Sequence, residues 1–136
     1  MKLLMIYSDR FAWRTAEKGL ESAAELSEER SLENVLVGWI HAEAQDEADP
    51  GKVETKLVKN LKWGARKNET TRILLHSFSH LAETKAAPEF TRALLERTEA
   101  RLQAAGYQTW QTPFGYFHDL ELAAPGKSAA RIFASF

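Results

Sequence analysis

The feature that most constrains this chain is a short apolar run that ends abruptly in polar side chains. Ile73–Leu75 follow the polar residues 68–72, a pattern that predicts a buried strand. His76 and His80 come soon after this run, with two serines between them. Because ligands commonly bind just beyond the C-terminal ends of strands in open sheets, the stretch predicts a polar site at one end of a sheet.

A second polar segment, residues 112–119, lies downstream between two stretches of alternating polarity. It contains a Pro-Phe-Gly-Tyr sequence that is followed by Phe117 and His118. Proline and glycine so close together are typical of a turn. We expect this segment to meet the end of the first strand, so that the two polar segments form one site.

Further apolar runs and two-residue alternations predict the rest of the sheet. Within residues 35–40, the strongest run of the first half, Gly38 indicates a bulge or a close approach of another segment. Residues 11–16 allow a strand or a helix, and residues 17–34 are predicted to be a solvated, partly helical excursion. The apolar residues 130–136 are expected to pack against the domain. The expected strands are residues 3–7, 11–16, 35–40, 73–75, 107–111 and 116–122.

An amphipathic helix is predicted to follow the break at Pro50-Gly51 and to extend to about Lys67. Valine and leucine recur on one face at helical spacing, and basic residues recur three and four positions apart on another. The basic face has two interpretations. It is a solvated surface, or it is a contact face for an RNA backbone in which Lys56 and Lys59 take part. The apolar set is Val53, Leu57, Val58 and Leu61, and the basic set is Lys52, Lys56, Lys59, Lys62 and Arg66.

A second helix is predicted from Pro88 or Glu89 to Ala105, with Gly106 as its C-cap. The order β-β-β-α-β-α-β-β then indicates an α/β or α+β domain with a mixed sheet and two long helices. A length of 136 residues fits a single domain that spans residues 1–136. The residues expected to point inward from the second helix are Phe90, Leu94, Leu95 and Leu102.

Composition excludes several classes of protein. The chain has no cysteine, so it has no disulfide, thiolate metal site or cysteine nucleophile. No apolar run approaches the roughly 18 residues of a membrane span, and no signal peptide is recognisable, so we expect a cytoplasmic protein without membrane contact. The formal net charge of −1 does not indicate a nucleic-acid-binding protein, although a local basic face would suffice for one.

The histidines are the residues best suited to chemistry. The spacing of His76 and His80 does not match a zinc site, so no metal is expected. Hydrolase-nucleophile and phosphate-loop motifs are absent as well. Imidazoles can orient a water molecule or donate to a developing oxyanion. Histidines near strand ends also serve simply as hydrogen-bond partners of the backbone, and both interpretations stay open. The four histidines are His41, His76, His80 and His118.

Four collinear segments carry a resemblance to a known family. They are Leu3–Asp9, Glu33–Val37, Phe78–Leu81, and Ala105–Tyr107 leading to Pro113–Tyr116. At these places the family reads apolar-Ile-His-Ser-Asp, Glu-Glu-Val-Leu-Val, Phe-Ala-His-Leu-Ser and Pro-Phe-Gly-Tyr-Tyr-Lys. Through the joint spacing of these segments the chain resembles the N-terminal editing domain of archaeal threonyl-tRNA synthetases, which shares its fold with D-aminoacyl-tRNA deacylases.

This resemblance implies a hydrolase that removes serine wrongly attached to threonine tRNA. A synthetic site rejects serine weakly, because one methyl group is worth only about 1–3 kcal/mol of discrimination. In the family the 2′-hydroxyl of the terminal adenosine helps to activate the water, and neither a metal nor a cofactor takes part. The implied partners are tRNA, a second copy of the chain in a homodimer, and a fused or separate synthetase catalytic subunit.

The resemblance also implies roles for individual residues. His80 matches the family's histidine beside the water and substrate, while His118 stands where the family has lysine and Arg131 where it has glutamate. Histidine can place a water as lysine does, but it is shorter and mostly neutral at pH 7. The alternatives are a D-aminoacyl-tRNA deacylase and a non-catalytic tRNA-binding domain. The implied substrate-binding residues are Ser8 and Asp9 at the end of the first strand, and Phe78, Ser79, Pro113, Phe114, Gly115, Tyr116 and Phe117.

Overall fold

The computed structural model describes residues 1–136 as a mixed sheet with two long helices. Its elements are β1 (Lys2–Lys18), β2 (Glu29–His41), η1 (Ala44–Ala48), α1 (Pro50–Lys67), β3 (Arg72–Ser77), α2 (Pro88–Ala104), β4 (Gln108–Gln111), β5 (Tyr116–Ala123), η2 (Ser128–Ala130) and β6 (Arg131–Ser135). The sheet order is β4-β3-β2-β1-β5, and β6 pairs with the first part of β1. The β2–β3 and β3–β4 pairs are parallel, and the others are antiparallel. Neither helix is long and apolar enough to cross a membrane.

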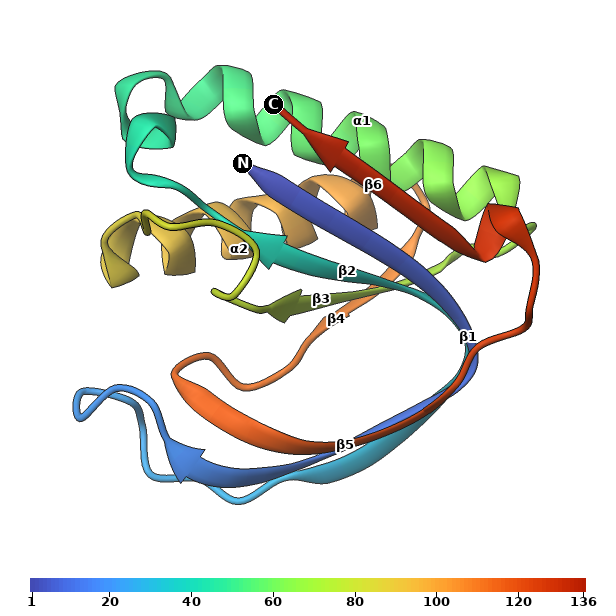
Figure 1. Cartoon of the computed structure of the whole chain (residues 1–136), viewed down its shortest axis with the longest axis horizontal. Coiled ribbons are helices and arrows are strands. Elements are labelled where there is room, and N and C mark those ends of the chain that lie inside the picture. The colour runs from blue at the N-terminus through green and yellow to red at the C-terminus, as the bar shows by residue number, and fades with distance from the viewer.

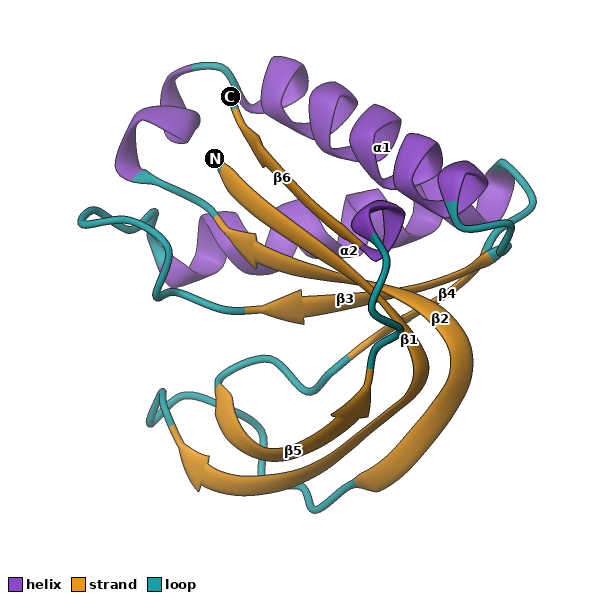
Figure 2. Ribbon diagram, turned by 45° about the vertical axis from the view of Figure 1, so that its right-hand side comes forward, coloured by secondary structure: helices purple, strands orange, loops and turns teal.

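The long strands β1 and β2 bend together at one level of the sheet. Ser8 and Phe11 of β1 are both buried, whereas the two residues between them are both exposed. Their partners on β2, Val35 and Leu32, also enclose two exposed residues, of which Asn34 has a φ of 51°. Two consecutive outward side chains interrupt the alternation of a regular strand. The sheet therefore curls at this corner, and its lower part becomes a half-barrel (Figures 1 and 2).

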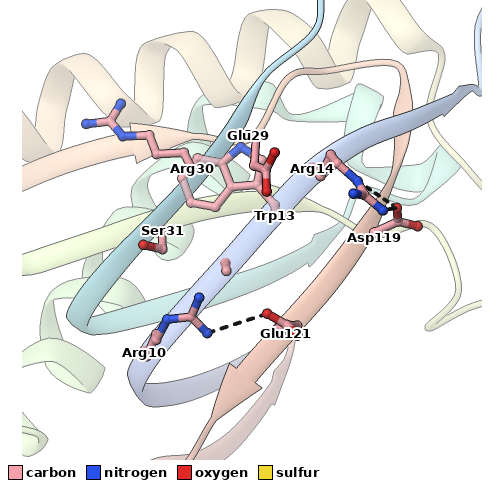
Figure 3. Close-up of a pocket in the computed structure, with 9 residues that line it drawn as sticks. Arg10, Trp13, Arg14, Glu29, Arg30, Ser31, Asp119 and Glu121 are labelled. Atoms are coloured by element: carbon pink, nitrogen blue, oxygen red, sulfur yellow. Dashed lines mark hydrogen bonds and ion pairs between the residues drawn. The ribbon is translucent and has the colours of Figure 1, made fainter.

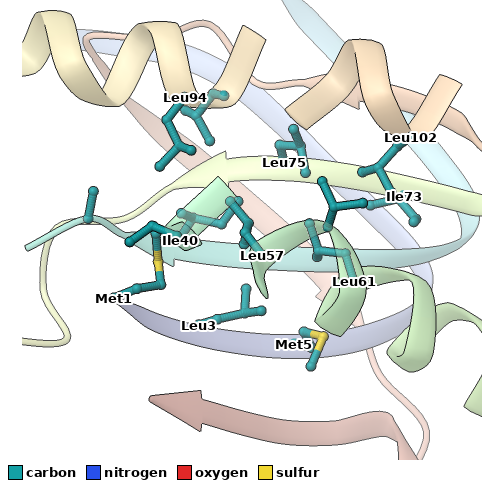
Figure 4. Close-up of a cluster of buried hydrophobic side chains, with 14 of the residues drawn as sticks. Met1, Leu3, Met5, Ile40, Leu57, Leu61, Ile73, Leu75, Leu94 and Leu102 are labelled. Atoms are coloured by element: carbon teal, nitrogen blue, oxygen red, sulfur yellow. The ribbon is translucent and has the colours of Figure 1, made fainter. Parts of the chain in front are cut away.

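Both helices cover the same face of the sheet, and the larger core lies beneath them (Figures 1 and 4). The apolar stripe predicted for α1 is buried, with Leu57 and Leu61 fully inaccessible. Leu94 and Leu102 of α2 are fully buried as well, which confirms the inward face of that helix, although Phe90 is only partly buried. Burial of each such leucine contributes roughly 1.5–3 kcal/mol relative to an exposed position. Both helices are confirmed within two residues of their predicted bounds.

Gly38 marks a close approach between β2 and α1, as one of its two interpretations predicts. A Cβ atom at this position would lie 2.8 Å from Cδ2 of Leu61. The pairing of β2 with β1 continues in regular register past Gly38, so there is no bulge here. Because Gly38 has no side chain, α1 packs directly against β2 at this position.

A smaller and more aromatic core fills the interior of the half-barrel. Its buried members include Phe11, Trp13 and Trp39, and no helical residue belongs to it. The rings of Phe11 and Trp39 meet edge to face with centroids 5.9 Å apart, a favourable arrangement for aromatic pairs. This interior is the face on which the two polar segments meet.

Three predictions for the strands are corrected by the structure. Residues 11–16 are not a separate element but the second half of β1. Residues 29–34, predicted to belong to a solvated excursion, form the start of β2, because their backbone pairs with β1 although most of their side chains are exposed. The apolar C-terminal segment does more than pack, since residues 131–135 form β6 along Lys2–Ile6.

Candidate functional site

The two polar segments meet where β3 ends and β5 begins, at one end of the half-barrel (Figure 1). Five rings gather there, with neighbouring centroids between 4.9 and 6.5 Å apart. We name this group the histidine cluster. Its members are His76 and Phe78 from the end of β3 and the loop after it, His80 from the same loop, and Phe117 and His118 from β5.

His76 is the most deeply buried histidine of the histidine cluster. Its Nδ1 lies 2.9 Å from Oγ1 of Thr112, and its ring meets the ring of Trp39 edge to face at 4.9 Å. Burial, together with the neighbouring His118, lowers the pKa of His76 from 6.5 to about 4. At pH 7 the ring is therefore neutral, and its contacts suit a supporting role.

His118 is the unsatisfied polar group of the histidine cluster. Both of its ring nitrogens are buried, and neither has a hydrogen-bond partner within the chain. Burial lowers the pKa of His118, although the carboxylate of Glu28 acts in the opposite direction. That carboxylate is itself engaged, because it accepts a hydrogen bond of 2.7 Å from Nε1 of Trp13.

A buried polar atom without a partner is uncommon in proteins and calls for an explanation. Neutral imidazole offers one donor and one acceptor, and the chain itself uses neither of them at His118. His80 is exposed at the rim of the same group, with its ring 6.5 Å from that of Phe117. The histidine cluster thus combines a buried imidazole that has no partner with an exposed imidazole at its rim.

His41, by contrast, has the structural role that histidines near strand ends often have. Its Nδ1 accepts a hydrogen bond of 2.9 Å from the amide of Leu81, which leaves Nε2 to donate to the carbonyl of Thr84 at 2.7 Å. The neutral ring therefore anchors the loop that carries Phe78 and His80.

The loop between β4 and β5 is held against the loop between β1 and β2. Gly115 has a φ of 87°, and its carbonyl accepts hydrogen bonds from the amides of Gly19 and Leu20. The Tyr116 hydroxyl donates a hydrogen bond of 2.6 Å to the carbonyl of Ala24, and it accepts one of 3.2 Å from the amide of Leu26. These bonds fix the start of β5 and hence the position of His118.

Ser8 and Asp9 do not lie at a strand end, because β1 continues to Lys18. Ser8 is buried opposite Val35 in the bend, whereas His76 lies level with Trp39. Val35 and Trp39 are four residues apart on β2, which corresponds to about 13 Å along a strand. Asp9 is exposed. The structure therefore does not bring this pair to the histidine cluster.

The remaining predicted residues are distributed over several surfaces. Phe114 packs against the helix-side core with the Arg92 guanidinium 5.1 Å above its ring. Ser79 and Pro113 are partly buried in the two loops that carry the cluster, and Lys56 and Lys59 are exposed on α1. Sequence reasoning missed Thr112 and Trp39 as supports of His76, and no local pattern marks either of them.

Arg131, aligned with a family glutamate, lies in a different part of the sheet from His118. It pairs with Ile6 of β1, whereas His118 pairs with Thr15. Its guanidinium donates to the carbonyl of Pro125 at 2.5 Å. Arg131 thus has a structural contact of its own near the bend between β5 and β6.

A separate charged groove of about 530 Å³ lies on the exposed side of β1, β2 and β5 (Figure 3). Its charges are largely paired, since Arg14 contacts Asp119 at 2.6 Å and Arg10 contacts Glu121 at 3.6 Å. Nowhere in the chain do three histidine, aspartate or glutamate side chains gather closely enough to hold a metal ion. The histidine cluster is therefore the strongest candidate for a functional site.

Comparison with solved structures supports the fold. The chain superposes on the c-Myc DNA Unwinding Element Binding Protein with a TM-score of 0.70 and 10% sequence identity, over 100% of this chain and 99% of that one. The expected mixed sheet with two long helices, typical of the D-aminoacyl-tRNA deacylase-like fold, is thereby confirmed.

Comparison of sequences identifies the family. The chain is 30% identical over 135 residues to the threonine--tRNA ligase of Thermococcus kodakarensis and 27% identical to that of Pyrococcus horikoshii. Each match covers 97% of this chain but only 22% of the ligase. The family model for the archaea-specific editing domain of threonyl-tRNA synthetase matches residues 1–136. This chain therefore belongs to the family of archaea-specific editing domains of threonyl-tRNA synthetase.

Proposed function

We propose that this chain hydrolyses L-serine from mischarged threonine tRNA, with the 2′-hydroxyl of the terminal adenosine assisting the attack of water. Membership in the editing-domain family supports a proofreading deacylase. The observation that carries the proposal is the pair of buried, unpartnered nitrogens of His118 within the histidine cluster.

In the proposed reaction a water oxygen attacks the ester carbonyl carbon. The bond from that carbon to the ribose 3′-oxygen breaks, and the 3′-oxygen takes up the proton that the water has lost. The 2′-hydroxyl assists deprotonation of the water, and neutral His118 holds the water in place with a ring nitrogen. Such positioning lowers the entropic cost of the attack. Exposed His80 contacts the aminoacyl ester, and Phe117 forms an apolar wall beside it.

The partners follow from this activity. The 3′ end of threonine tRNA is the substrate, and Lys56 and Lys59 contribute positive charge for its backbone. A homodimer and an association with a synthetase catalytic subunit, in the same chain or another, belong to the proposal, as does a cytoplasmic location without membrane contact. No metal or cofactor enters the reaction.

Deacylation of threonine tRNA charged with L-serine, L-threonine or D-serine tests the proposal. We expect rapid loss of L-serine alone, and loss of that activity when the terminal 2′-hydroxyl is removed. Selective loss of D-serine would instead identify a D-aminoacyl-tRNA deacylase. No turnover at near-stoichiometric protein, with tRNA still bound, would identify a non-catalytic binding domain.

A further inference from the structure

The outward face of α1 is a concentrated positive surface in a chain whose formal net charge is −1. Residues 50–67 include six lysines and arginines but one acidic residue, Glu54. Glu54 faces α2, where Arg97 and Arg101 pair with it. None of the six α1 cations forms an ion pair with a carboxylate. Their charge is therefore directed to solvent without neutralisation.

The second half of α1 shapes this charge into an open groove of about 470 Å³. Trp63 lies in the groove with 42% of its surface exposed, whereas Trp13 and Trp39 are buried and Trp110 is partly buried. The ammonium of Lys67 lies 5.5 Å above the Trp63 ring. We name this surface the α1 groove, and its lining residues are Lys59, Asn60, Lys62, Trp63 and Arg66.

We propose that the α1 groove binds the ribose–phosphate backbone of tRNA, with Trp63 stacking on a base or ribose. This inference rests on the proposed function, which makes tRNA the substrate. Lysines and arginines that replace condensed counterions supply most of the affinity for a nucleic-acid backbone. An exposed aromatic ring among them offers a surface on which a base can stack. An acidic protein segment has no bases to stack on the ring. Lys59 lines the groove together with Lys62 and Arg66, and exposed Lys56 adds its charge on the same helix just outside the lining.

The position of the α1 groove separates its role from the chemistry. α1 covers one face of the sheet, and the histidine cluster belongs to the opposite, half-barrel face (Figure 1). A single nucleotide in the histidine cluster cannot also touch α1, whereas a folded tRNA is large enough to contact both. The groove therefore contributes affinity for the body of the tRNA and does not touch the reacting ester.

Binding of uncharged threonine tRNA, measured by intrinsic fluorescence at several salt concentrations, tests the inference. For the double variant Lys59→Ala/Lys62→Ala we expect roughly tenfold weaker binding near 0.1 M salt, and a salt dependence whose slope falls by about 1 per lysine removed. The control Arg10→Ala/Arg14→Ala removes the same charge from the outer side of β1 and should stay within about twofold of wild type. Trp63→Phe should abolish most of the fluorescence change on binding.

Three results would overturn the inference: no measurable tRNA binding by the wild type, wild-type affinity and salt slope in the lysine variant, or equal binding of polyglutamate at matched charge. The last would identify an acidic protein partner instead. The readout is independent of hydrolysis. A wild-type protein that binds tRNA through the groove but never deacylates it refutes the proposed function alone, and a deacylase whose lysine variant binds normally refutes the groove alone.

Discussion

The imidazole rings of His76 and His118 lie 5.8 Å apart, although they belong to strands that are not neighbours in the sheet. Two strands, β2 and β1, separate β3 from β5. In a flat sheet this separation is three strand spacings, or about 14 Å. The curl of the half-barrel closes that distance across its interior, and this long-range geometry buries the nitrogens of His118.

Replacing His118 with alanine should reduce deacylation of L-seryl-tRNA without unfolding the protein. His118 is only partly buried and has no hydrogen-bond partner, so its removal leaves no other polar group unpaired. Loss of a water-positioning imidazole is expected to lower kcat roughly 10²-fold, the lower end of the range for acid–base groups. Single-turnover rates and thermal melting measure the two effects. His80→Ala should lower the rate too, since the proposed reaction has His80 contact the ester.

His41→Ala is an informative comparison for these variants. It removes the anchor of the loop at Leu81 and Thr84, so it should lower stability as well as rate. Wild-type rates in both His118→Ala and His80→Ala would contradict the roles assigned to the histidine cluster.

Folding stability should fall on mild acidification because of His76. Its pKa is lowered from 6.5 in the unfolded chain to about 4 in the folded one, so between these values the unfolded chain binds more protons. The stabilisation is complete above pH 6.5 and is lost as the pH falls through 6.5 towards 4. From pH 7 to pH 5 the loss from this residue is roughly 2 kcal/mol.

Urea unfolding at pH 7 and pH 5 measures this dependence. His76→Phe keeps a ring against Trp39 but removes the titrating group, so its free energy of unfolding should change less between the two pH values. An equal change in wild type and variant would show that His76 is not the source.

The elements with strong local periodicity were predictable from sequence. The stripe of Leu57 and Leu61 in α1 and the apolar run of β3 each depend on neighbours a few residues away, so a local pattern captures them. Residues 29–34 were not predictable in this way. They form a strand through backbone bonds to β1, a partner that their polar side chains do not indicate.

Only those features of the site that depend on neighbouring residues in the sequence were predictable. The sequence indicates polar segments around the end of β3 and the start of β5, and the structure brings His76 and His118 together. Whether a histidine has hydrogen-bond partners depends on residues far away in the sequence. His41 bonds to the carbonyl of Thr84, whereas neither ring nitrogen of His118 has a partner in the chain. Ser8 does not lie at a strand end as expected, because β1 passes through its bend and continues to Lys18, which no local pattern in the sequence indicates.

Tyr116→Phe should loosen the loop between β1 and β2 while leaving the core intact. The lost hydroxyl bonds to Ala24 and Leu26 amount to about 1 kcal/mol each at most, because the freed groups gain access to water. Hydrogen exchange measured by mass spectrometry should become faster in residues 20–27. Tyr7→Phe, which removes one exposed bond to Asn34, is the matched control and should leave that loop unchanged. Slow exchange in the Tyr116 variant would mean that Gly115 alone holds the loop.

Gly38→Ala should destabilise the domain by about 1–3 kcal/mol, because the new methyl group would overlap the Leu61 side chain. Leu61 is fully buried between α1 and the sheet, so it has little room to move aside. Gly126→Ala is the control, since a Cβ there meets nothing within 4 Å. Urea denaturation of Gly38→Ala in wild-type and Leu61→Val backgrounds completes the test. The shorter valine should reduce the cost of the alanine, and equal costs in both backgrounds would show that the contact between Gly38 and Leu61 does not set the distance of α1 from the sheet.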